Sequence, residues 1–271
     1  QKAWVDSRGD IIREETGIGW VLRREDASAA TRMYSNAAKS DTELAELVSV
    51  ASNMILSPDK LSSLTIALSG APDGLSLENQ RQTIVEQDGQ ATVIEIVREN
   101  FDESASLALP VQEWPEFLTA SDFVQSADPD ILAQSRLIIG KEKDSWQAAK
   151  KINAWVYEQI RKVPVVSVPS AIDVLETKEG DCNEHTVLFT ALARAAGIPT
   201  RMHVGLAYSN GRFFYHAWPS VYVGRWVDMD PTFGQNRADA AHIKLIEGDV
   251  GRQLDVIKLV NKIKLEVRGY R

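Results

Sequence analysis

The sequence predicts an α+β protein with a β-rich N-terminal region over residues 1–115 and a second domain over residues 116–271. Apolar and polar residues alternate on both sides of an Asp-Gly dipeptide in residues 83–97, which is typical of a β-hairpin. Pro110 and Pro115 then interrupt both helical and strand periodicity, so we place the domain boundary near residue 115. Helical patterns with capping residues follow, and they lead to a second predicted hairpin.

Composition and charge exclude several classes of protein. The 271 residues include 38 acidic and 30 basic side chains, a formal net charge of −8, which argues against nucleic acid as a partner because phosphate binding needs a basic face. No apolar run approaches the roughly 20 residues that cross a bilayer, so no integral membrane span is expected. A single cysteine excludes a disulfide within the chain. The chain begins Gln1-Lys2-Ala3 without an initiator methionine, so we expect it to be a processed or truncated part of a longer polypeptide.

Start and stop signals predict the positions of the helices. One helix is expected over about residues 28–51 of the N-terminal region. In the second domain, Asp128 precedes a proline and begins a helix that runs through Ile139. Asp144, with Gln147 three residues later, begins the next helix. Apolar residues recur at helical spacing in that helix, so its tryptophan is assigned to the core.

The only cysteine, Cys182, stands where a helix is expected to begin. Asp181 is a good N-cap residue, and Glu184 three positions later completes a capping-box pattern. Apolar positions follow on one face until Gly197 and a proline end the helix. Cys182 is therefore placed at the positive end of the helix dipole, with a main-chain N–H that has no partner within the helix. We expect this position to lower the pKa of the thiol below the roughly 8.5 of a free cysteine.

A nucleophilic thiol needs a base and a third group that fixes the tautomer of the base. His216 lies in a strand-like segment that leads to a Gly-Arg turn, and the return strand ends at Asp230. Cys182, His216 and Asp230 are therefore candidates for nucleophile, base and orienting carboxylate. His185, on the helix of the cysteine, is a competing base, and Asp228 is a competing carboxylate.

Strand parity restricts the turn of this hairpin. Residues two apart share a face of a strand, so a strict two-residue turn would put Asp230 on the face opposite His216. We therefore predict a three-residue connection over residues 223–225, with Tyr222 opposite Trp226, or else a bulge at the proline of the first strand.

Two stretches of the sequence resemble the core of bacterial transglutaminase-like proteins. They read GDCNEHTVLFTALARAAGIPTRMHVGLAY and YHAWPSVYVGRWVDMDPTFGQ, and the resemblance covers roughly residues 165–247. It implies a papain-like α+β core, a catalytic triad of Cys182, His216 and Asp230, and no metal or organic cofactor. Many members carry an aromatic residue where this chain reads RKVPVV, so no side-chain oxyanion donor is transferred from the family.

The first residues, AWVDSRGDIIREETGIGWVLRREDASAA, are similar to a segment that precedes such cores in longer bacterial proteins of the envelope or the secreted fraction. This similarity implies a location in the bacterial cell envelope or outside the cell.

The resemblance implies acyl transfer on peptide or amide substrates through a cysteine thioester. We expect a hydrolytic enzyme of peptidase or amidase type with a peptide or protein as its substrate. A protein cross-linking transglutaminase uses the same steps until the last one, so the motif leaves it open. An arylamine acyltransferase would have a glycine-rich stretch before the cysteine, which this chain lacks. A binding module that keeps the fold without catalysis is the alternative from another class.

Overall fold

The computed structural model describes most of the chain. The described residues are 2–8, 11–15, 21–24, 49–72, 74–163, 170–248 and 262–271. By contacts the chain divides into two compact units, Gln1–Val48 and Ser49–Arg271. In the first unit, the strands β1 (Lys2–Val5), β2 (Ile11–Glu15) and β3 (Val21–Arg23) form an antiparallel three-stranded sheet in this order.

The second unit is built on a central antiparallel sheet. Its strands run in the order β12 (Trp226–Asp228), β11 (Arg212–Tyr222), β10 (Thr200–Ser209) and β13 (His242–Glu247), and β4 (Ser49–Ala51) also pairs with β11. The long hairpin of β10 and β11 forms the middle of the sheet. Residues 49–51, the end of the helix predicted over residues 28–51, form the strand β4 instead, so this part of the prediction is wrong. The rest of that predicted helix lies outside the described residues.

A second antiparallel sheet contains the hairpin predicted around the Asp-Gly dipeptide. Its order is β14 (Lys264–Tyr270), β5 (Ser63–Ser69), β7 (Ala91–Val97) and β6 (Gln82–Gln87). In the turn between β6 and β7, the Asp88 side chain accepts hydrogen bonds from the main-chain N–H groups of Gln90 and Ala91, both at 2.9 Å, and Gly89 has a φ of 80°. These features confirm the predicted hairpin, because such a turn needs a positive φ.

The boundary predicted near residue 115 lies inside the second compact unit. The reason is sheet pairing: β14, from the C-terminal end of the chain, completes the sheet of β5, and β4 pairs with β11. The central sheet and the second sheet of this unit thus each contain strands from both sides of residue 115.

Helices cover one side of the central sheet. They are α3 (Pro129–Ile139), α4 (Ser145–Gln159), α5 (Ala171–Thr177) and α6 (Cys182–Ala195), and the short strands β8 (Arg161–Lys162) and β9 (Glu179–Gly180) form a parallel pair beside them. The side chains of Asp128 and Asp144 accept the N-capping hydrogen bonds that the sequence predicts. Every residue of α6 from Glu184 to Ala193 is buried, so α6 is the central helix of this layer.

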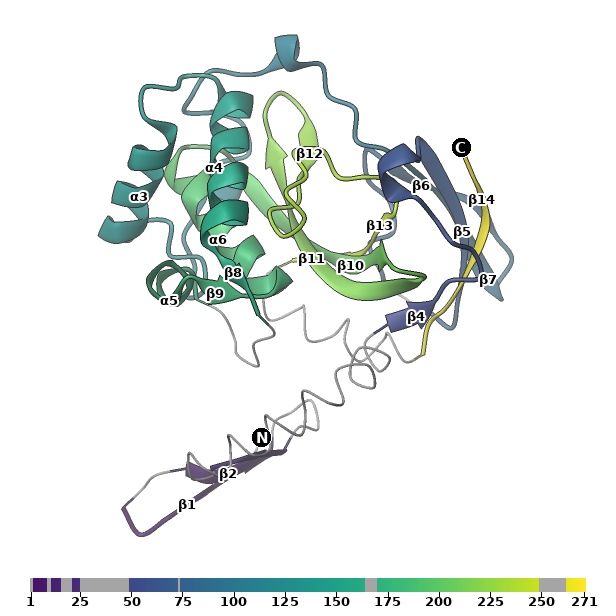
Figure 1. Ribbon diagram of the computed structural model, residues 1–271, viewed down its shortest axis with the longest axis horizontal. Coiled ribbons are helices and arrows are strands. Elements are labelled where there is room, and N and C mark those ends of the chain that lie inside the picture. The colour runs from purple at the N-terminus through teal and green to yellow at the C-terminus, as the bar shows by residue number, and fades with distance from the viewer. Residues whose placement is uncertain are drawn as a thin grey trace. The chain divides into compact units, whose positions relative to one another are not determined.

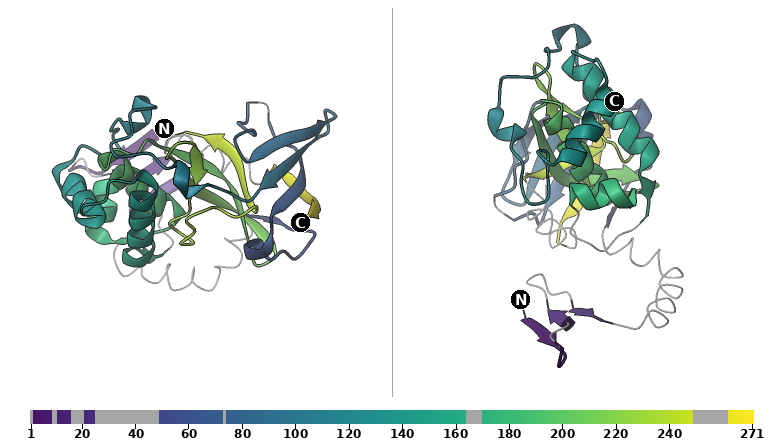
Figure 2. Two further views of the ribbon diagram at one scale, coloured as in Figure 1. Left: turned by 90° about the horizontal axis from the view of Figure 1, so that it is seen from above. Right: turned by 90° about the vertical axis from the view of Figure 1, so that its left-hand side faces the viewer.

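Two hydrophobic cores hold the layers together. The first lies between the helices and the central sheet and includes Trp146, Ile152, Phe189, Leu192, Met202 and Val227. The second includes residues of both sheets, among them Leu64, Ile66, Ile94, Leu206, Phe213 and Ile243. Figures 1 and 2 show the helices on one side of the central sheet and the second sheet on the other. The fold class is α+β, as predicted, and no helix of the described segments is long and apolar enough to cross a membrane.

Candidate active site

The start of α6 fixes Cys182 at the first helical position. The Asp181 side chain accepts a hydrogen bond from the main-chain N–H of Asn183 at 2.9 Å and completes a capping box with Glu184, whose Oε2 accepts from the Asp181 N–H at 2.9 Å. This confirms the predicted cap. Gly180 precedes it because a Cβ there would overlap the Glu184 side chain. Gly180 therefore leaves space for the Glu184 side chain to reach the Asp181 N–H.

A contact between α6 and β11 brings Cys182 to the residue that follows His216. The Thr186 hydroxyl, one turn after Cys182, donates a hydrogen bond to the carbonyl oxygen of Ala217 at 3.0 Å. The main-chain N–H of the same Ala217 faces the thiol and favours its anion. Within the described residues, no hydrogen bond joins the thiol to His216.

The thiol of Cys182 differs from the sequence prediction in its acidity. Burial raises its pKa well above the ordinary value, and the carboxylates of Asp181, Asp230 and Glu184 add to the rise, although the Ala217 N–H opposes them. Burial and the neighbouring Glu184 also raise the pKa of Asp181 to about 7. The predicted low pKa is therefore wrong: the dipole of α6 meets a buried, acidic surrounding that disfavours the thiolate.

The hairpin of β11 and β12 has the predicted three-residue connection. Tyr222 pairs with Trp226, and the Val223 N–H donates to the carbonyl oxygen of Arg225 at 3.0 Å. Gly224, in the middle, has a φ of 113°, which suits glycine. The register continues past β12, because the Met229 N–H donates to the carbonyl of the proline in β11 at 3.0 Å. This register confirms the parity argument.

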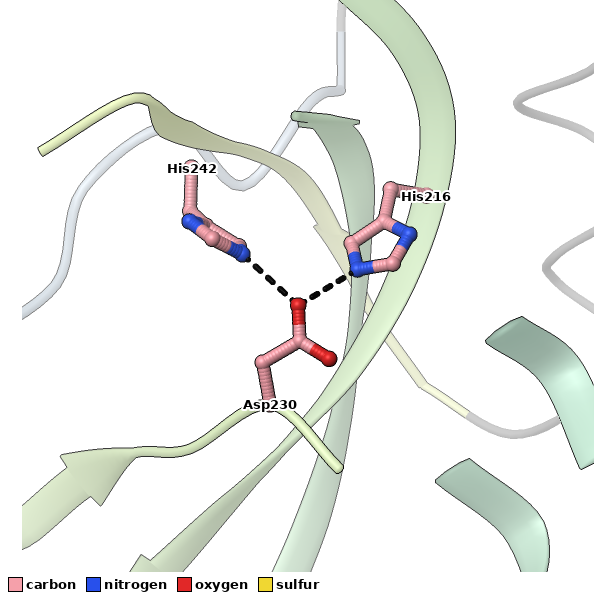
Figure 3. A group of neighbouring side chains, drawn as sticks. All are labelled: His216, Asp230 and His242. Carbon is pink, nitrogen blue, oxygen red and sulfur yellow. Dashed lines mark hydrogen bonds and ion pairs between the residues drawn. The ribbon is translucent and has the colours of Figure 1, made fainter. Parts of the chain in front are cut away.

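The hairpin brings His216 and Asp230 into direct contact. His216 Nε2 donates to Asp230 Oδ2 at 2.7 Å (Figure 3). The other carboxylate oxygen, Oδ1, accepts from the main-chain N–H groups of Thr232 at 2.7 Å and Phe233 at 3.0 Å. The Phe233 ring stacks on the His216 ring with a centroid distance of 4.7 Å. Because Nε2 is occupied, Nδ1 is the nitrogen of His216 that remains available to receive a proton.

A second histidine binds the same carboxylate, and sequence reasoning missed it. His242 Nε2 lies 2.9 Å from Asp230 Oδ2, and His242 Nδ1 lies 2.9 Å from Asp239 Oδ1. Burial lowers the pKa of His242, but Asp239 and Asp230 outweigh it and raise this pKa to about 9. The Asp-x-x-His spacing directly before an apolar strand is the sequence signal that could have indicated this residue.

The ligand atoms of His216, Asp230 and His242 lie within 4.8 Å of one another, a spacing that a metal ion could bridge. In the present arrangement both imidazole Nε2 atoms are hydrogen-bonded to the same carboxylate oxygen. A bound metal ion would therefore have to displace two protons. That no metal is used stays a prediction.

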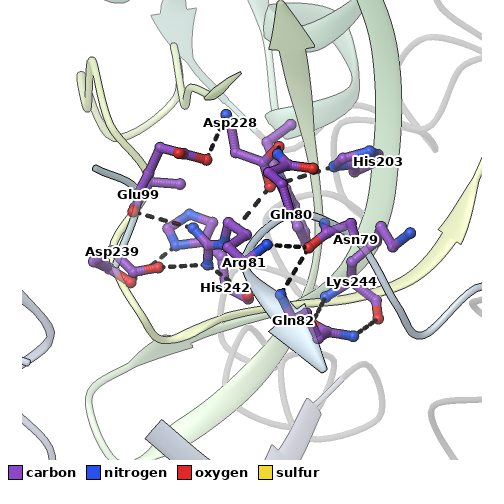
Figure 4. Close-up of polar contacts among 12 residues, drawn as sticks. Asn79, Gln80, Arg81, Gln82, Glu99, His203, Asp228, Asp239, His242 and Lys244 are labelled. Atoms are coloured by element: carbon purple, nitrogen blue, oxygen red, sulfur yellow. Dashed lines mark hydrogen bonds and ion pairs between the residues drawn. The ribbon is translucent and has the colours of Figure 1, made fainter. Parts of the chain in front are cut away.

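Asp228 and His185, the alternative carboxylate and the alternative base, contact other residues. Asp228 is buried beside Arg81 and His203 (Figure 4). Trp218 Nε1 also donates a hydrogen bond to its Oδ2 at 3.2 Å. His185 is fully buried, and its Nδ1 lies 2.6 Å from the carbonyl oxygen of Asp181. Burial also lowers the pKa of His185. The geometry thus joins His216 to Asp230 and leaves both competitors outside the pair.

The raised pKa of His242 predicts a pH-dependent stability. The stabilising contribution is fully present below pH 6.5 and is lost as the pH rises through about 9. The difference in unfolding free energy between the wild type and His242→Gln should therefore shrink over this window, by about 3 kcal/mol at most. Urea unfolding of both proteins at pH 6 and pH 9.5 measures it. A difference that is equal at the two pH values contradicts the prediction.

Comparisons with known proteins agree with this fold. Residues 133–231 match the model of the transglutaminase-like superfamily. No curated protein matches the sequence. Among solved structures, a protein described as a putative cysteine protease from Cytophaga hutchinsonii is 18% identical with a TM-score of 0.55, over 76% of this chain and 81% of that chain. The periplasmic domain of TgpA from Pseudomonas aeruginosa is 14% identical with a TM-score of 0.46, over 71% of this chain and 91% of that chain. Residues 133–231 are therefore similar to the transglutaminase-like superfamily, and the Cytophaga hutchinsonii structure shows a similar fold.

Proposed function

We propose that the protein is a cysteine-dependent acyl-transfer enzyme that hydrolyses peptide or amide substrates through a thioester on Cys182. The observation that supports this most is the 2.7 Å hydrogen bond from His216 to Asp230. It leaves Nδ1 of His216 free, on the strand to which the helix of Cys182 is bound at Ala217. Nucleophile, base and orienting carboxylate are then supplied by neighbouring elements.

In the proposed reaction, the Cys182 proton moves to Nδ1 of His216 while Sγ attacks the carbonyl carbon of the substrate. Because burial raises the pKa of the thiol, proton transfer accompanies the attack rather than preceding it. His216 then protonates the leaving amine, the C–N bond breaks and a thioester remains. Water attacks the thioester, His216 takes its proton, and the thiol regains that proton as the acid is released.

The main-chain N–H of Cys182 is the group best suited to bind the developing oxyanion. In the first turn of α6, the N–H groups of Asn183 and Glu184 are bound by the Asp181 side chain. The Cys182 N–H has no partner among the described residues, and it lies at the positive end of the helix. One such donor contributes roughly 10²- to 10³-fold to a rate.

The last step separates two candidate reactions. If a primary amine replaces water at the thioester, the same residues perform cross-linking instead of hydrolysis. We favour hydrolysis, on a substrate of the bacterial cell envelope or outside the cell, as the sequence resemblance implies.

A substrate screen tests this proposal. A panel of peptides and glutamine amides is incubated with the wild type and with Cys182→Ala, and the released amine is measured with and without a labelled primary amine. We expect release from at least one substrate by the wild type alone, without incorporation of the label. Incorporation would favour cross-linking. A second assay measures alkylation of Cys182 at pH 7, which should be slower in His216→Ala. Equal alkylation rates together with no release would indicate a binding module.

A further inference from the structure

The Asp230 carboxylate binds two imidazoles, although the proposed reaction uses one. We propose that His242 is a positioning residue whose imidazolium holds Asp230 and offsets one of the two negative charges that Asp230 and Asp239 carry. This inference rests on the proposed function, because it assigns His242 a task in the acyl transfer by His216.

The hydrogen bonds of His242 require both of its nitrogens to carry protons. Nε2 faces Asp230 Oδ2 and Nδ1 faces Asp239 Oδ1, both at 2.9 Å (Figure 3). A carboxylate only accepts hydrogen bonds when ionised, so a ring between two carboxylates donates at both ends only as an imidazolium. The pKa of about 9 agrees with this geometry.

The partner carboxylate of His242 is itself fixed. Asp239 Oδ1 accepts from the Ala241 N–H at 2.8 Å, and Oδ2 accepts from the Gln235 side-chain amide at 2.8 Å. Gln235 and Asp230 exchange two main-chain hydrogen bonds of 2.8 Å. The loop from Asp230 to His242 thus closes on itself and holds the imidazole in one place.

Arg81 binds this loop from the segment before β6. Its guanidinium donates to the carbonyl oxygens of Ala238 at 3.1 Å, Asp239 at 2.7 Å and His242 at 2.9 Å (Figure 4). Arg81 is 3% exposed, so these bonds are shielded from water. A residue from the N-terminal part of the sequence therefore supports the position of His242.

The charges explain why a second imidazole matters. Asp230 carries a negative charge in contact with His216, Asp239 carries a second one at the other nitrogen of the His242 ring, and the His242 imidazolium offsets one of the two. When His216 takes the proton of the thiol, the side chains of Asp230, Asp239, His242 and His216 together carry no net charge. Without the charge of His242, whose ring centroid is 5.6 Å from that of His216, the Asp230 carboxylate would make His216 bind a proton more tightly. A larger share of His216 would then already be protonated and unable to accept the proton of Cys182.

Other charged or titratable groups also face this cluster. They are Arg81 at the His242 carbonyl, and Cys182 and His185 of α6, on which the charge of Asp230 acts. Among the described contacts, none of these three residues forms a hydrogen bond with the imidazole ring of His242. The imidazolium of His242 is thus the positive group held directly against Asp230.

Histidine titration by NMR tests the proposal without relying on activity. In a Cys182→Ala background, the Cε1 protons of the histidines are followed against pH in the presence and absence of His242→Gln. We expect the proton affinity of His216 to rise about tenfold or more in the variant. In the protein with an intact thiol, the acidic limb of the kcat profile should move to higher pH by the same factor. An unchanged His216 titration would overturn the proposal, whatever happens to the melting temperature.

Two further variants separate positioning from folding. His203→Gln is the matched control, because His203 is equally buried on the adjacent strand but lies near Asp228 and Glu247 instead of Asp230. It should lower stability and leave the His216 titration unchanged; a His216 shift as large as in His242→Gln would overturn the proposal. If His242→Gln does not fold, His242→Asn replaces it and should raise the His216 proton affinity in the same direction, because it removes the same positive charge. A titration that follows the prediction while no substrate is cleaved would refute the proposed function alone.

Discussion

Replacing Asp230 with asparagine should lower kcat/KM by roughly 10³- to 10⁴-fold while the protein stays folded. The main-chain N–H groups of Thr232 and Phe233 need an acceptor at Oδ1. They will therefore hold the amide oxygen of the new side chain, and its NH₂ group will face His216. A donor facing Nε2 forces the proton of the ring onto Nδ1, which can then no longer accept the proton of Cys182. The measurement is kcat/KM on the best substrate of the panel, with circular dichroism to verify folding.

Asp228→Asn is the matched control for this experiment. Asp228 is as buried as Asp230 but faces Arg81 and His203, so its loss leaves the contact of His216 intact. Removing the charge leaves the buried Arg81 guanidinium without this carboxylate, and we expect a loss of about 3 kcal/mol in stability with a much smaller change in kcat. A larger loss of kcat/KM from Asp228→Asn than from Asp230→Asn would contradict the assignment of the carboxylate.

Gly205→Ala should cause a large loss of stability, about 3 kcal/mol or more. Gly205 pairs with His216 on one side and with Lys244 of β13 on the other. A Cβ at this position would overlap the main-chain carbonyl oxygen of Ile243 and would lie 3.0 Å from the Leu245 nitrogen. Main chain cannot turn aside as a flexible side chain does, so β13, which begins with His242, would have to move. Urea unfolding measures the effect.

Gly269→Ala provides the comparison for this glycine. Gly269 also lies in a strand, β14, but an added Cβ would meet nothing within 4 Å. The substitution should change stability by less than about 1 kcal/mol. Equal losses of stability in the two alanine variants would show that the close approach of β13 is not the reason why position 205 requires glycine.

Local signals in the sequence were sufficient for much of the fold and for part of the site. The caps at Asp128, Asp144 and Asp181 depend only on residues within one turn, and the structure has all three. The register of the second hairpin followed from the requirement that His216 and Asp230 share a face, which admits few turns. Such constraints are short in range, so they can be read from a single sequence.

The remaining features depend on partners that are distant in the sequence. The strand β14 and the binding of Arg81 to the loop before β13 involve segments far apart in the chain, and no local pattern connects them. The acidity of Cys182 was mispredicted for the same reason, because the helix start is visible in the sequence but burial and the approach of Asp230 are not. The contact between His242 and Asp230 likewise depends on the path of the loop between them, which no local pattern indicates.

The pairing of β14 with β5 has a consequence for synthesis on the ribosome. Strand β5 ends at Ser69, and its neighbour β7 is made soon afterwards, but β14 starts only at Lys264. At the usual rates of translation, the nascent chain therefore carries an open strand edge for roughly 10 to 40 s. An open edge invites pairing with other chains, so aggregation is the main hazard of this interval. A chain that is cut before Lys264 keeps the open edge permanently.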